Sequence, residues 1–96
     1  MSVQRSAASA YGNLKGDESL TVSSSAVPLA SVASGALTAL VTNGAEPIRV
    51  RWGTPTASVG HILQPYSVMD LYSSMEEARF IRTGAADSTI FVTYFG

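Results

Sequence analysis

Two arginines on one short segment are the residues of this chain best suited to hold an anion. Arg49 and Arg51 alternate with apolar residues in segment 46–60, EPIRVRWGTPTASVG, until a Gly-Thr-Pro turn ends the pattern. Because neighbouring residues of a strand point to opposite faces, both guanidinium groups share one face and Trp52, the chain's only Trp, takes the other. Such forked donors suit a phosphate backbone, a catalytic anion or a protein neighbour, and the same face can also lie in water.

The charge balance argues against nucleic acid. The 96 residues include six Lys or Arg and seven Asp or Glu, a formal net charge of −1, whereas nucleic-acid-binding domains normally carry a basic face. No apolar run approaches the length of a membrane span. Low charge with many small polar residues also indicates a surface covered by other protein. We expect Arg49 and Arg51 to contact a subunit or partner, or else to face solvent, and expect no nucleic-acid and no membrane partner.

Residues for enzyme chemistry are few. The chain holds one histidine, His61, and no cysteine, which is too little for a metal site built on imidazole and thiolate ligands. Serines are plentiful, but no Gly-x-Ser-x-Gly elbow occurs. The neighbouring carboxylates Asp17 and Glu18, and likewise Glu76 and Glu77, diverge on a strand or a helix and form no acid/base couple. We expect no enzyme, no metal and no cofactor, and interpret His61 as a polar residue at the start of a strand.

Strands must position these residues, because apolar and polar residues alternate through most of the chain from Leu20 onward. Segments 37–43 and 47–52 flank an Asn-Gly turn and predict a hairpin, as do segments 79–83 and 88–95 around GAAD. Pro28 indicates an edge strand or a bulge. SSMEEA is the one convincing helical turn.

About eight short strands with turn residues between them predict an all-β fold. We expect a small antiparallel β-sandwich or barrel of the jelly-roll or Greek-key kind, with Trp52 in its core. Residues 1–18 are small, polar and aperiodic, and are interpreted as a flexible N-terminal arm that orders against a neighbour or as a loose terminus. The sandwich domain is then 19–96.

The last strand is apolar on both faces. Ile90, Val92 and Tyr94 alternate with Phe91 and Phe95. A sandwich strand needs only one buried face, so the second face is expected to meet another subunit.

Three stretches carry a resemblance to a known group of proteins. ALVTNGAEPIRVRWGTPTASVGHIL, VMDLY and ARFIRTGAADSTIFVTYF resemble small virion proteins of tailed bacteriophages, with matching pieces at 47–60, 68–72 and 79–95, about 60 of the 96 residues. The resemblance implies a structural protein of the phage particle, and it favours a capsid decoration or cement protein. Such a protein would be made in the host cytoplasm, form a dimer or trimer, and bind the major capsid protein on the head surface.

Another role stays open, that of a tail or fibre module that binds host-surface carbohydrate or other tail proteins. Its candidate sugar-stacking residues are Tyr11, Tyr66 and Tyr72. For the structural role, the predicted protein interface consists of Arg49, Arg51, Arg82, Phe91, Phe95 and Tyr11.

Overall fold

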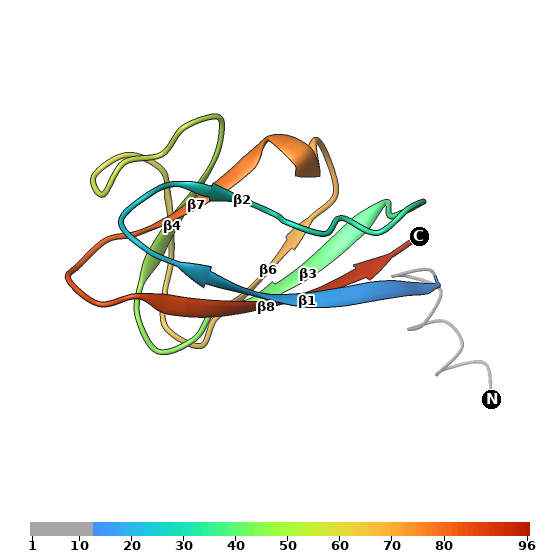
Figure 1. Cartoon of the computed structure of the whole chain (residues 1–96), viewed down its shortest axis with the longest axis horizontal. Helices are drawn as coiled ribbons and strands as arrows, with labels where there is room; N and C mark the ends of the chain where they lie inside the picture. Colours follow the sequence, from blue (N-terminus) through green and yellow to red (C-terminus); the bar gives the residue numbers. More distant parts are fainter. Residues whose placement is uncertain (1–12) are drawn as a thin grey trace.

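The computed structural model describes residues 13–96, which form two four-stranded antiparallel sheets (Figure 1). Sheet A holds, in order, β1 (Leu14–Val22), β8 (Ser88–Phe95), β3 (Thr38–Thr42) and β6 (Val68–Leu71). Sheet B holds β2 (Val27–Pro28), β7 (Ala78–Arg82), β4 (Ile48–Trp52) and β5 (His61–Leu63). The all-β sandwich is confirmed, and the barrel alternative is wrong because both sheets stay open at their edges.

The chain changes sheet at every link between these strands except one. Only β4 and β5 are consecutive strands that pair with each other within 13–96. The orders β1-β8-β3-β6 and β2-β7-β4-β5 place each strand of sheet A at the position held by a sequence neighbour in sheet B. This is the strand order of a jelly roll, one of the two topologies expected from the sequence.

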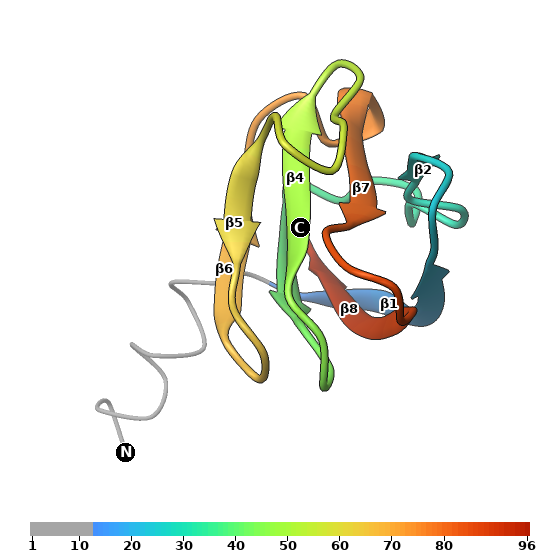
Figure 2. The same ribbon diagram turned by 90° about the vertical axis from the view of Figure 1, so that its left-hand side faces the viewer.

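Both predicted hairpins are therefore wrong. β3 and β4 lie in different sheets, and so do β7 and β8, so their links are arches across the sandwich (Figure 2). A turn sequence between two half-apolar strands does not distinguish a pair within one sheet from a pair that faces across the core. Here β3 and β4, and likewise β7 and β8, face each other across the core and do not hydrogen-bond to each other.

Asn43 shows what holds the first of these arches. Its side chain is buried, and Nδ2 donates to the carbonyl oxygens of Glu46 at 2.8 Å and of Leu63 and Gln64 at 3.0 Å. Its Oδ1 accepts the hydroxyl of Ser88, itself buried, at 2.9 Å. One amide thus ties the β3–β4 arch to the β5–β6 link and to the start of β8. We call this set the Asn43 cluster.

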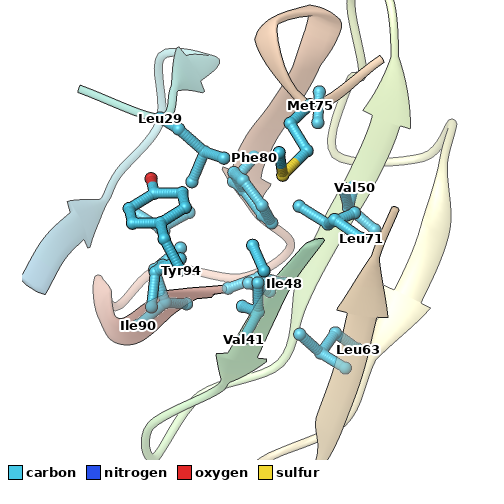
Figure 3. Close-up of a cluster of buried hydrophobic side chains, with 14 residues drawn as sticks. Leu29, Val41, Ile48, Val50, Leu63, Leu71, Met75, Phe80, Ile90 and Tyr94 are labelled. Carbon is cyan, nitrogen blue, oxygen red and sulfur yellow. The ribbon is translucent and has the colours of Figure 1, made fainter. Parts of the chain in front are cut away.

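The core lies between the two sheets, and Figure 3 shows it. Ile90 and Tyr94 of β8 face Ile48 of β4 and Phe80 of β7, and none of the four side chains is exposed. The inner face predicted for β8 is confirmed. Pro28 lies in the edge strand β2, as its missing N–H predicts.

The SSMEEA segment forms one 3₁₀ turn, η1 (Met75–Glu77), which caps the core with Met75. No helix of the described residues is long and apolar enough to cross a membrane.

The predicted start of the domain at residue 19 is too late. β1 begins at Leu14 and pairs with β8, with a register shift between Leu14 and Gly16, and Asn13 exchanges two backbone hydrogen bonds of 2.8 Å with Gly96. Residues 14–18 therefore belong to sheet A, because the edge of β8 supplies ladder bonds that require no apolar pattern in the partner. The arm prediction for residues 1–12 lies outside the described residues.

Asn43→Ala should destabilise the protein by about 2–4 kcal/mol, because it leaves buried carbonyls without donors and removes several hydrogen bonds at once. Urea unfolding followed by circular dichroism measures this. The matched control is Asn13→Ala, at the chain's other asparagine, which is exposed and should change little. Equal stability of the two variants would contradict the role given to the Asn43 cluster.

Candidate functional site

A pocket of about 410 Å³ opens at one end of the sandwich, where β4 and β6 finish. Its walls come from both sheets and from the segment that links β6 to η1. The lining residues are Trp52, Asp70, Tyr72, Ser73, Ser74 and Glu77. We call this hollow the end pocket.

Trp52 forms a fixed wall of the end pocket, so the prediction that it lies in the core is wrong. It shares the inward parity of Ile48 and Val50, but as the last residue of β4 it stands beyond the core and keeps 39% of its surface exposed. Its indole Nε1 donates to the carbonyl oxygen of Ser73 at 2.8 Å. The ring of His61 meets it edge-on, with centroids 6.2 Å apart. The indole is therefore held in place before any ligand arrives.

The other walls are polar or exposed. Tyr72 is 74% exposed, and Ser74 holds a left-handed backbone conformation with φ of 53°. Asp70 and Glu77 bring the pocket's charged groups, and no basic residue lines it. Across residues 13–96, no group of three or more His, Asp or Glu side chains is placed to hold a metal ion. The end pocket thus combines aromatic surface with hydrogen-bond acceptors.

Arg49 and Arg51 hold the β4–β5 loop of their own chain. Arg49 donates from Nε to the carbonyl oxygen of Ala57 at 2.9 Å and from Nη1 to that of Gly60 at 2.8 Å. Arg51 donates from Nη1 to the carbonyl oxygen of Thr54 at 3.1 Å. This use of the two guanidinium groups was not predicted from the sequence. The sequence signal that could have predicted it is the β4–β5 loop, which follows β4 directly and places backbone carbonyl groups over the face that carries the two arginines.

Arg79 joins these two on the outer face of sheet B, where it pairs across the strands with Arg51. Arg82 lies on the opposite face of β7 and forms an ion pair with Asp87. That is the only ion pair within the described part of the chain. The three outer arginines therefore have no carboxylate partner there.

The outer face of sheet A carries four apolar side chains among polar ones. Phe91 lies on β8, an interior strand, between Ser19 of β1 and Thr42 of β3, and is 48% exposed. Leu40, Val68 and Phe95 lie on the same face by register. We call these four residues the apolar outer face. It brings together two predicted interface residues, Phe91 and Phe95, and leaves the arginines on other faces; Tyr11 lies outside the described residues.

Glu18 is a structural residue that the sequence analysis placed in the arm. Its carboxylate accepts the backbone N–H groups of Ala30 and Ser31 at 3.2 and 2.9 Å, and it accepts the hydroxyl of Tyr94. Burial raises the pKa of Tyr94, and the hydrogen bond to Glu18 and its negative charge raise that pKa further. Extending the Leu20 and Val22 alternation back by two residues would have placed Glu18 on the inner face.

Comparison of the chain with known protein families, with curated proteins and with solved structures finds no match.

The free energy of unfolding should fall as the pH rises above 10.0, the ordinary pKa of tyrosine. Folded Tyr94 keeps its proton there while the unfolded chain releases it, so the stabilising contribution is complete below that pH and is lost above it. Urea unfolding at about pH 8.5 and about pH 11 measures the slope. Tyr94→Phe should lose this part of the pH dependence, and the exposed Tyr66→Phe should keep it. Parallel pH curves for wild type and Tyr94→Phe would refute the assignment.

Arg49→Ala should loosen the β4–β5 loop more than Arg51→Ala does, because Arg49 makes two hydrogen bonds to it and Arg51 makes one. Thr56 and Val59 bond to each other within that loop, so their amides report its opening. Hydrogen exchange measured by NMR should speed up at these two amides by about tenfold in Arg49→Ala. Unchanged exchange in Arg49→Ala would show that the guanidinium does not hold the loop.

Proposed function

We propose that the protein is a structural component of a tailed-bacteriophage particle, a head decoration protein that binds the assembled shell as a homo-oligomer. The observation that carries the proposal is the exposure of Phe91 at the centre of a sheet whose other face is already covered. The resemblance of segments 47–60, 68–72 and 79–95 to phage virion proteins supports the part of the proposal that places the protein in a phage particle.

The apolar outer face has no use in a lone sandwich. Phe91 and Val68 are each about half exposed, at 48% and 55%, with Thr42 between them, and Leu40 and Phe95 lie further along the same face. Burial of one such side chain contributes about 1.5–3 kcal/mol of stabilisation. A contact that buries the apolar outer faces of two copies against each other gains this contribution from several side chains. Packing of this face against the same face of a second copy, the arrangement of a two-fold dimer, supplies that cover.

In such a dimer the outer face of sheet B stays accessible and is the surface that would bind the capsid shell. Arg49, Arg51 and Arg79 lie there, and their charges have no carboxylate partner within residues 13–96. Guanidinium groups that already donate to loop carbonyls still have unused N–H donors for carboxylates of a capsid protein. An oligomer that carries several such faces gains affinity by multivalency even where each contact is weak.

Phe91→Asp should convert the oligomer to a monomer, because a charge at the centre of the contact cannot be buried unpaired. Size-exclusion chromatography with light scattering measures the mass, and circular dichroism checks that the fold is kept. Ile62→Asp is the matched control, since Ile62 is 49% exposed on the outer face of sheet B, and it should remain an oligomer. A monomeric wild-type protein would exclude the self-contact.

The particle itself gives the second test of this function. Mass spectrometry of purified particles should find the protein in many copies, and the purified protein should bind undecorated heads. Absence from the particle would end the proposal of a virion role, even where the protein proves to be an oligomer.

A further inference from the structure

We propose that the end pocket binds a neutral saccharide. This inference rests on the pocket alone and does not depend on a role in the phage particle. The pocket's residues come from β4, from β6, from the segment after it and from η1, and no predicted interface residue lines it.

The first requirement of a saccharide site is an aromatic surface for the apolar C–H face of the sugar ring. Trp52 supplies one, and the hydrogen bond to Ser73 together with the edge-on contact of His61 fixes its orientation. Tyr72 supplies a second ring from the segment that follows β6. A ligand that stacks on Trp52 therefore meets a surface that loses little freedom on binding, and such preorganisation raises affinity.

The second requirement is acceptors for ligand hydroxyl groups. An ionised carboxylate only accepts hydrogen bonds, so Asp70 and Glu77 call for a ligand rich in donors. The hydroxyls of Ser73 and Ser74 can donate or accept. Two negative charges without a basic neighbour in the lining repel phosphorylated, sulfated or acidic ligands. What remains is a neutral polyhydroxy compound or a cation.

Size and solvation favour the neutral polyhydroxy compound. A volume of about 410 Å³ falls in the range of small-molecule pockets and exceeds what one ammonium or guanidinium group fills. Asp70 and Glu77 are exposed, so water and salt screen their attraction for a cation. Hydrogen bonds to several hydroxyls and stacking on a fixed indole do not depend on that attraction. A mono- or disaccharide uses the aromatic wall, the carboxylates and the serines together.

The chain provides its own reporter and its own control for a test. Trp52 is the only tryptophan, so fluorescence excited at wavelengths beyond the tyrosine absorption band reports on the end pocket. Tyr66 is 73% exposed, almost as much as Tyr72 at 74%, and does not line the pocket. Asn is the substitution for both, because Tyr66 has a φ of 61° that Asn tolerates.

The full-length protein is titrated with methyl glycosides of glucose, galactose, mannose and N-acetylglucosamine, and separately with choline and arginine. Each probe is taken to about 50 mM, above the millimolar dissociation constants that an open site reaches. At least one glycoside should change Trp52 fluorescence in a saturable way that added salt does not weaken. Tyr72→Asn should weaken that binding about three- to tenfold, and Tyr66→Asn should leave it unchanged.

Three outcomes overturn the proposal. No saturable response to any of the four glycosides shows that the end pocket is not a saccharide site. A response only to choline or arginine that salt abolishes assigns it to cations. An equal loss in Tyr66→Asn and Tyr72→Asn places the binding elsewhere than between Trp52 and Tyr72.

Discussion

The sandwich depends on a buried amide that closes one of its ends. Asn43 gives its donors to carbonyls of the β3–β4 arch and the β5–β6 link, and its acceptor takes the hydroxyl of Ser88 at the start of β8. Chain links that pass from one sheet to the other leave the ladder, and their backbone groups then need other partners. One side chain provides these partners for several links at once, so the arches can lie close together and the sheets can face each other in register.

The end pocket lies at the opposite end of the sandwich. β4 and β6 both run away from the Asn43 cluster, so their last residues, Trp52 and Leu71, reach the far end of the sandwich (Figure 2). Ile48, Val50 and Trp52 of β4 all point toward the inner side, but Trp52 lies beyond the end of the core. Its indole is therefore partly exposed and forms a wall of the end pocket. β4 thus has one more inward-pointing residue than the core can cover.

Alternation in the sequence was sufficient to predict the faces of the strands, but the partners of the strands required more. The buried face of β8 and the edge position of Pro28 followed from period two and from a missing N–H. The arches did not, since Asn43-Gly44 is a turn signal for a hairpin and for an arch alike. What separates the two is the burial of Asn43, which depends on carbonyls about twenty residues further along the chain.

Except for Tyr72, which was a sugar-stacking candidate, the candidate site escaped prediction for related reasons. Arg49 and Arg51 bond to backbone carbonyls, and a backbone carbonyl leaves no mark in the sequence. The end pocket combines residues from three segments that are near one another only because β4 and β6 end at the same level. Trp52 was assigned to the core because it alternates with outward-pointing residues. The alternation predicts correctly that its side chain points inward, but it does not show where along the strand the core ends.

The apolar outer face and the end pocket meet at β6, and this links the two proposals physically. Asp70 pairs with Leu40 across the strands of sheet A and also lines the end pocket, so the pocket lies at the rim of the apolar outer face. Two copies packed across that face would keep the centre, Phe91, out of water and leave both rims accessible. A saccharide site with millimolar affinity is weak alone, but copies held at fixed spacing on one assembly bind a repetitive glycan surface far more tightly than any one of them. The proposed self-association through sheet A and the proposed recognition at the sandwich end would therefore share only the rim at Asp70.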